Sequence, residues 1–188
     1  MSENLNEKYG LNPAHSEIVA AVGLAPVGKA LEMGCSNGRN ALFLAQQGFE
    51  VTAVDNNPTA IQMLRDIAEA ENLSHLNAQV YDIQDANLSE MYDFIGCTVT
   101  LMFLNPATVA EVIANMQEHT RQGGYNVIVC AMDTAQYPCP MPFPFTFKEG
   151  QLKAAYEGWE IIKYNEDLGT MHNGAQLQFA TLIAKRQS

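Results

Sequence analysis

Apolar runs and amphipathic stretches alternate along most of the chain. Runs of apolar residues with few polar interruptions predict buried strands, and apolar side chains spaced three and four residues apart predict helices between them. Strands are predicted over residues 28–33, 49–55, 78–83, 92–101 and 125–132. Helices are predicted from Arg39 to Gln47, from Pro58 behind an Asn57 cap, and from Asn105-Pro106 to Gly123-Gly124. This order is typical of a parallel sheet covered by helices on both faces.

The last part of the chain has a different pattern. Residues 133–150 alternate proline with apolar and aromatic side chains, and because proline cannot donate to a sheet ladder we expect a stiff, extended loop over the sheet. This loop is either a hydrophobic strap over an edge or one wall of an acceptor site. A helix over 149–157 and strands over 159–165 and 176–184 follow, and Asn173-Gly174 predicts a tight hairpin turn.

These elements predict one α/β domain over residues 1–188. We expect a three-layer, Rossmann-like fold with a mostly parallel seven-stranded sheet and an antiparallel strand contributed by the C-terminal hairpin. Residues 1–27 precede the first strand, so they are free to cross the sheet as a lid or cap.

The acidic composition narrows the choice of partners. The chain carries 21 Asp and Glu against 10 Lys and Arg, a formal net charge of −11, whereas nucleic-acid-binding proteins meet phosphates with basic patches. We therefore expect a small-molecule partner and no nucleic acid. With no long apolar run and no cleavable leader, we expect no membrane insertion and a cytoplasmic location. The four cysteines lack metal-ligand spacing and are predicted to be buried hydrophobes, without a metal site.

A turn of small residues follows the first predicted strand. It reads Glu32-x-Gly34-x-Ser36-x-Gly38, and small residues let the backbone turn sharply beside a ligand while the amides of the next helix start point at it. The glycine pattern of dinucleotide-binding turns is broken, because Ser36 and Arg39 stand where its later glycines would be. The spacing instead resembles the first motif of class I S-adenosylmethionine-dependent methyltransferases. The structural alternative is a tight turn that binds no ligand.

Further candidates stand at the ends of later strands. Asp55 closes the second strand, where an acid can accept hydrogen bonds from both ribose hydroxyls. Asp82 and Ile83 close the third strand, and Thr98 lies near the end of the fourth. Because the carboxyl ends of parallel strands share one edge of a sheet, we expect these residues around S-adenosyl-L-methionine or its product S-adenosyl-L-homocysteine. Asp82 is expected near the adenine.

Several long and unusual strings are spread over essentially the whole chain. They are Lys8-Tyr9-x-Leu11, His15-Ser16-Glu17, Gly38-Arg39-Asn40, Leu101-Met102-Phe103-Leu104, Ile113-Ala114-Asn115-Met116-Gln117, Ala131-Met132-Asp133-Thr134-Ala135, Tyr137-Pro138-Cys139, Phe147-Lys148-Glu149-Gly150, Tyr156-Glu157-Gly158-Trp159-Glu160 and Lys163-Tyr164-Asn165-Glu166-Asp167. In these strings the chain resembles the tellurite-resistance methyltransferases, also called tellurite-resistance protein B. The resemblance implies a class I methyltransferase that transfers a methyl group from S-adenosylmethionine to tellurite, with selenite as a related acceptor.

The resemblance also implies roles for single residues. It places Tyr9 and His15 in an N-terminal segment that folds over the cofactor, and it places His172 where the family has a histidine proposed to orient the oxyanion. Cofactor positions carried over from the family are Gly34, Arg39, Asp55, Asp82 and Thr98. After the histidine, family members carry arginines on the hairpin, where this chain has Asn173, Gly174, Gln176 and Gln178.

The basic candidates for holding the oxyanion are Arg39, His15 and His172, with His15 and His172 as the candidate catalytic residues. Each of them has a structural alternative. These are an ion pair with a sheet-edge acid for Arg39, a helix-start role for His15 and a solvated hairpin position for His172. Two other functions stay open. One is a methyltransferase for a small thiol or another soft nucleophile, which the apolar loop and the missing arginines favour. The other is a protein that binds S-adenosylmethionine without catalysis.

Overall fold

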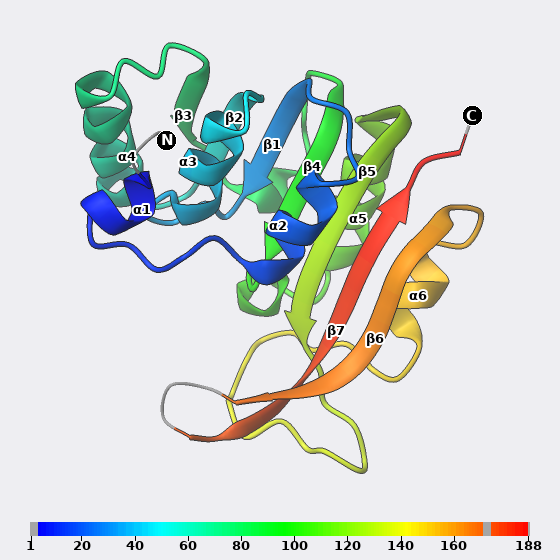
Figure 1. Ribbon diagram of the computed structural model, residues 1–188. Coiled ribbons are helices and arrows are strands. Elements are labelled where there is room, and N and C mark those ends of the chain that lie inside the picture. Colours follow the sequence, from blue (N-terminus) through cyan, green and yellow to red (C-terminus); the bar gives the residue numbers. More distant parts are fainter. Residues whose placement is uncertain (1–3, 171–173, 188) are drawn as a thin grey trace.

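The fold is organised around a seven-stranded sheet with the order β3-β2-β1-β4-β5-β7-β6 (Figure 1). The computed structural model describes residues 4–170 and 174–187. Strand β7 runs antiparallel to both of its neighbours, and the other neighbouring pairs are parallel. The strands are β1 (Lys29–Met33), β2 (Glu50–Asp55), β3 (Leu76–Val80), β4 (Tyr92–Thr98), β5 (Thr120–Ala131), β6 (Glu160–Thr170) and β7 (Gln176–Lys185). The predicted fold class is confirmed.

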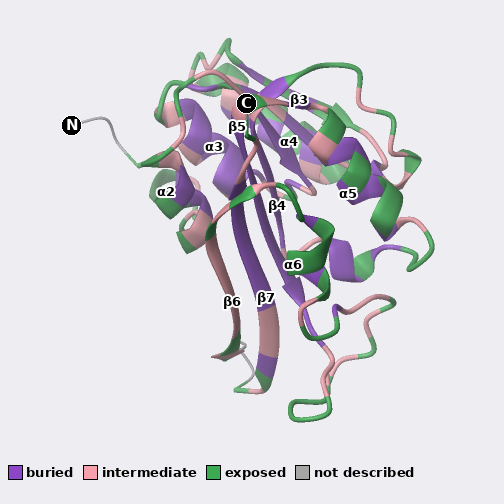
Figure 2. Cartoon of the chain, turned by 90° about the vertical axis from the view of Figure 1, so that its right-hand side faces the viewer, coloured by how far each residue is buried: buried purple, intermediate pink, exposed green. Residues whose placement is uncertain are grey.

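Helices cover the sheet on both faces and produce two apolar cores. Residues of α2, α3 and α4 form one core, and residues of α5 and α6 form the other. Buried strand residues lie between these layers (Figure 2). The helices are α1 (Leu5–Lys8), α2 (Ser16–Val22), α3 (Arg39–Gln46), α4 (Pro58–Ala70), α5 (Val109–Glu118) and α6 (Gln151–Ala155), with short 3-10 helices η1 (Ile83–Asp85) and η2 (Leu101–Phe103). In the described part of the chain, no helix has the length and apolarity needed to cross a bilayer.

The start of α4 follows the predicted capping. The Asn57 side chain accepts hydrogen bonds from the amides of Thr59 and Ala60, and Pro58 occupies the first helical position. This satisfies amide groups that have no partner inside the helix. The capping fixes the chain direction immediately after the end of β2.

The predicted starts of α5 and of β5 are both wrong. Asn105 makes a turn by accepting from the Ala107 amide, and the helix begins only at Val109. Strand β5 begins at Thr120, so both predicted stop glycines lie inside it. The β4–β5 ladder has an irregularity there, and a Cβ on Gly124 would lie 3.0 Å from the Asp93 carbonyl oxygen. The glycines therefore serve a bulge in a strand.

The third and fourth strands end earlier than predicted, and this places residues at the sheet edge. Strand β4 stops at Thr98 because Val99 has a φ of 58°, which turns the chain out of the sheet. Strand β3 stops at Val80, and Asp82 caps η1 by accepting from the Gln84 amide. Both departures occur where the sheet opens into a cavity.

Candidate functional site

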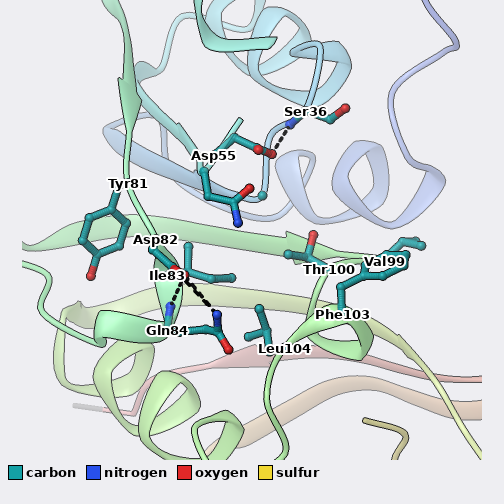
Figure 3. A pocket seen from close by; sticks show the side chains of 12 residues that line it. Ser36, Asp55, Tyr81, Asp82, Ile83, Gln84, Val99, Thr100, Phe103 and Leu104 are labelled. Atoms are coloured by element: carbon teal, nitrogen blue, oxygen red, sulfur yellow. Dashed lines mark hydrogen bonds between the residues drawn. The ribbon is translucent and has the colours of Figure 1, made fainter. Parts of the chain in front are cut away.

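A cavity of about 380 Å³ lies at the carboxyl edge of the sheet (Figure 3). Its walls come from the turn after β1, the ends of β2 and β4, and the segments that carry η1 and η2. The lining residues are Gly34, Ser36, Asp55, Asn56, Tyr81, Asp82, Ile83, Gln84, Val99, Thr100, Phe103 and Leu104. Five predicted cofactor residues therefore share one cavity: Gly34, Ser36, Asp55, Asp82 and Ile83.

The turn after β1 has a backbone shape that demands small residues. Gly34 has a φ of +69°, and a Cβ there would overlap the Thr100 side chain. Gly38 has a φ of +90°, and a Cβ there would overlap Leu64. Ser36 adopts a φ of 49° although it is not glycine. The small residues thus allow the turn to lie close to the segment that follows β4 and to α4.

Asp55 is held rigidly at the cavity wall. Its Oδ2 accepts from the Ser36 amide at 2.8 Å, and its Oδ1 accepts from the Asn57 amide at 2.9 Å. One carboxylate thereby joins the turn after β1 to the start of α4. Each oxygen keeps a lone pair for a further donor.

Asp82 is the second carboxylate in the cavity. Its Oδ1 accepts from the Gln84 amide at 3.0 Å, and the Gln84 side chain accepts in turn from the Asn105 amide at 2.8 Å. Since β2 and β3 are adjacent, Asp55 at the end of β2 and Asp82 shortly after the end of β3 both reach the cavity (Figure 3).

Val99 adds a strained backbone to the cavity. A β-branched residue at positive φ is a genuine outlier, because its side chain crowds the backbone. Such strain costs on the order of 1 to 3 kcal/mol and clusters at functional sites. The Val99 amide is held by the Val129 carbonyl at 2.7 Å. The surrounding sheet therefore imposes this conformation.

The charges of the cavity favour one kind of adenosyl ligand. Among the described residues, the lining contains two acids and no Lys or Arg. A pyrophosphate would meet two carboxylates and no cation from this lining, which is unfavourable. A nucleoside with hydroxyl donors and a positive charge matches the same groups. Ile83, Phe103 and Leu104 supply apolar surface for a base.

Glu32 and Thr98 lie beneath the cavity and do not line it. They are 1% and 7% exposed, and both side chains accept from the Asn40 amide group, at 2.7 and 3.1 Å respectively. Burial raises the pKa of Glu32 to about 7, against the Asn40 hydrogen bond and the Arg39 charge, which lower it. The second Glu32 oxygen has no hydrogen-bond partner among the described residues.

The N-terminal candidates lie outside the cavity. The Tyr9 hydroxyl bonds to Glu71 at 2.5 Å, at the end of α4. His15 caps α2, accepting from the Glu17 amide through Nδ1 at 3.2 Å, which matches its helix-start alternative. Arg39 opens α3, and its guanidinium donates to the Pro13 carbonyl at 3.4 Å.

The charge state of His15 follows from these surroundings. Burial lowers its pKa, and the Arg39 and Lys163 charges lower it further, against the Glu17 charge, which raises it. A neutral imidazole is therefore favoured near neutral pH. His172, the other histidine candidate, lies outside the described residues.

A family model described as tellurite resistance protein TehB matches residues 2–183. The chain belongs to this TehB family. A relative from Haemophilus influenzae strain 10810, named "Probable S-adenosyl-L-methionine-dependent methyltransferase TehB", is 44% identical over 97% of this chain and 65% of its own length. A relative from Eikenella corrodens, named "Hemagglutinin 1", is 48% identical over 98% of this chain and 63% of its own length. The chain thus spans less than two thirds of the length of these two relatives.

A solved structure supports the same assignment. The crystal structure of TehB from Haemophilus influenzae superposes with a TM-score of 0.93 and 43% identity, covering 97% of this chain and 66% of that one. The fold of this TehB family member is therefore the class I methyltransferase fold.

The sequence missed several residues that the structure brings to the site of this TehB family member. Tyr81, Gln84, Phe103 and Leu104 line the cavity, and Asn40 lies beneath it. Tyr81 and Gln84 lie close to the end of a predicted strand, and this position could have indicated that they line the site. Phe103 and Asn40 stand in strings that the family resemblance had already singled out, without a role for either side chain.

Proposed function

We propose that the chain is an S-adenosyl-L-methionine-dependent methyltransferase that binds its cofactor in the cavity at the carboxyl edge of the sheet. The observation that carries the proposal is the rigid Asp55 carboxylate, which stands beside the Gly34 turn in a cavity whose described lining holds no Lys or Arg. Membership of the TehB family supports the same activity. Asp55 is the residue proposed to accept from the ribose hydroxyls, and Asp82 the one near the base.

The chain's contribution to the reaction is alignment. When bound, the cofactor supplies a methyl group already activated by its sulfonium charge. The Gly34 turn and the Val99 backbone fix the walls of the cavity, and Phe103 and Leu104 supply apolar surface. Alignment of two reactants can contribute roughly 7 to 11 kcal/mol, so no strong base is required.

We propose a tellurite or selenite oxyanion as the acceptor, following the family to which the chain belongs. A lone pair on tellurium would form the new bond to carbon as the carbon–sulfur bond breaks, and the sulfonium charge is neutralised. No proton leaves the acceptor before attack. The loop 133–150 supplies one wall of the acceptor site in this proposal.

A small thiol is the second candidate acceptor, favoured by one observation. The rings of Phe143 and Phe103 pack edge to face with their centroids 5.3 Å apart, and this pair gives the loop an apolar surface beside the cavity. Lys148 of the same loop is already engaged, because it pairs with Asp133 at 2.7 Å. A soft, weakly hydrated nucleophile suits such a surface.

The cofactor assignment is tested by calorimetry with S-adenosyl-L-homocysteine. We expect Asp55→Asn to weaken binding by about 1 to 3 kcal/mol, because two ribose hydroxyls lose their charged acceptor. Asp85→Asn is the matched control, since Asp85 is exposed and does not line the cavity. Equal affinity of Asp55→Asn and the parent would rule out this placement.

The acceptor is tested by transfer of labelled methyl groups. Parent protein is incubated with tellurite, selenite and a small thiol in separate reactions. Turnover on the oxyanions supports the first candidate, and turnover on the thiol alone supports the second. Binding without turnover on any of the three contradicts both acceptor proposals.

A further inference from the structure

The segment between α1 and α2, residues 9–15, runs beside the cofactor turn without entering the cavity. Figure 1 shows it crossing from α1, next to α3 and α4, to α2 in front of the sheet. None of the described residues that line the cavity comes from this segment. Any effect of the segment on a bound ligand must therefore pass through residues that lie between the two.

One hydrogen bond of the segment ends on a buried polar side chain. The backbone amide of His15 donates to the Asn40 side-chain oxygen at 2.8 Å. Further polar attachments involve Glu71, which binds Lys8 and Tyr9, and Pro13, whose carbonyl accepts from Arg39. Asn40 is 4% exposed, so water cannot readily replace the bonds of its side chain.

Asn40 uses the other end of the same amide to hold two strand ends. Its nitrogen donates to Glu32 at the end of β1, at 2.7 Å, and to Thr98 at the end of β4, at 3.1 Å. A single side chain at the start of α3 thus joins the start of α2 to the two central strands. The amide fits this position because it offers an acceptor on one side and donors on the other.

The two strand ends lead directly into the cavity wall. Gly34 and Thr100, which line the cavity, each lie two residues beyond a partner of Asn40. The Thr100 hydroxyl also donates to the Thr98 carbonyl at 3.1 Å. A shift at Glu32 or Thr98 therefore moves the wall.

The sheet is shaped to admit the Glu32 carboxyl. A Cβ on Gly96 would overlap the Glu32 Oε2 atom and would lie 2.9 Å from Ile18 of α2. Glycine at this position leaves room for the carboxyl beneath α2. Glu32 therefore lies between α2 and the cavity wall.

We propose that Asn40 is a positioning residue that ties the N-terminal segment to the cofactor-binding turn, so that the segment and the cavity wall are ordered together. The ligand side of this inference rests on the proposed function. The tie itself is a property of the free chain and is measurable without any ligand.

The first test is the isosteric variant Asn40→Asp. It keeps an acceptor for the His15 amide, loses both donors and sets a second carboxyl against Glu32. Because repulsion from Glu32 displaces the introduced carboxyl from the His15 amide, we expect hydrogen exchange of that amide in the free protein to become at least about tenfold faster. Affinity for S-adenosyl-L-homocysteine should fall about tenfold. The control is Asn115→Asp, another buried helix asparagine with side-chain bonds, in α5 on the opposite face.

The second test is the rescue variant Asn40→Asp combined with Glu32→Gln. The glutamine amide introduced at position 32 can donate to the carboxylate introduced at position 40, so the bond is restored with donor and acceptor exchanged. We expect slow exchange and most of the affinity to return. A residue that only fills space would show no such rescue.

The outcomes separate this inference from the proposed function. Parent protein that fails to bind S-adenosyl-L-homocysteine contradicts the proposed function, and the exchange measurement still decides the tie. Exchange and affinity unchanged in Asn40→Asp overturn the positioning role. So does an equal loss in Asn115→Asp, or a double variant no better than the single one.

Discussion

Glu32 has the most perturbed carboxyl group among the residues around the site. It is 1% exposed, and one of its oxygens has no hydrogen-bond partner among the described residues. Burial raises its pKa from 4.5 to about 7. The titratable or charged neighbours that interact with it are Arg39, Cys35 and Cys97. A raised acid pKa means that the folded protein holds a proton that the unfolded chain releases.

The sign of the pH dependence follows from this difference. Below about pH 4.5 the group is protonated in both states, and its contribution to stability is fully present. As pH rises from about 4.5 through about 7, the unfolded chain loses its proton first, so the free energy of unfolding falls by up to about 3 kcal/mol. Above that pH range the free energy of unfolding no longer changes through this group.

We predict that Glu32→Gln removes this fall. The free energy of unfolding, measured by urea titration at steps from pH 4.5 to pH 8, should decline less in the variant than in the parent. Glu69→Gln, at an exposed position of α4, is the control and should keep the parent profile. Parallel profiles for parent and Glu32→Gln would contradict the assigned pKa.

Among the elements, the loop 133–150 is attached to the sheet and to η2 by backbone hydrogen bonds. Its later part is fixed by two backbone bonds: the Phe147 amide donates to the Ala131 carbonyl at 3.0 Å, and the Phe145 amide donates to the Met102 carbonyl at 3.2 Å. The rings of Phe143 and Phe103 then meet beside the cavity. The loop is therefore joined to η2, which lines the cavity.

We predict that Phe143→Ala acts on the acceptor and spares the cofactor. An aromatic pair is worth about 0.5 to 1.5 kcal/mol, so the KM for the acceptor should rise about two- to tenfold. Affinity for S-adenosyl-L-homocysteine should stay within about twofold, since Phe143 does not line the cavity. Tyr137→Ala in the same loop is the control. An equal effect on cofactor affinity would show that the loop is no separate acceptor wall.

The order of the elements was predictable from the sequence because periodicity and caps are local signals. The Asn57-Pro58 start of α4 is one example. The ends of β4 and α5 were not predictable, because they depend on the strained Val99 turn and on a bulge in which Gly124 meets Asp93. Such contacts form only after distant segments have met.

The same limit applies to the site. Asp55 and Asp82 were found because strand ends collect at one edge of a parallel sheet. Asn40 was not assigned a role, since a polar residue in the first turn of a helix is typical of a solvated position. It is buried by a segment that lies 25 residues away in sequence.

Over the whole molecule, the net charge of −11 opposes the approach of an anion. Salt screens this repulsion, because the Debye length falls from about 20 Å to about 7 Å between roughly 20 and 200 mM. We predict that kcat/KM for tellurite rises about two- to fivefold over this range. A neutral thiol is the control acceptor and should show little change. A falling value for tellurite would indicate a local cationic site that outweighs the net charge.

The position of β7 also constrains how the molecule is made. Among the described strands, β6 joins the sheet only through β7, which comes later in the chain and lies between β5 and β6. During synthesis, the apolar edge of β5 therefore stays open until the residues of β7 have left the ribosome. An exposed strand edge invites pairing with other chains. The β6–β7 pair thus covers the free edge of β5. A nascent chain that lacks this pair exposes that edge and is a candidate for chaperone binding.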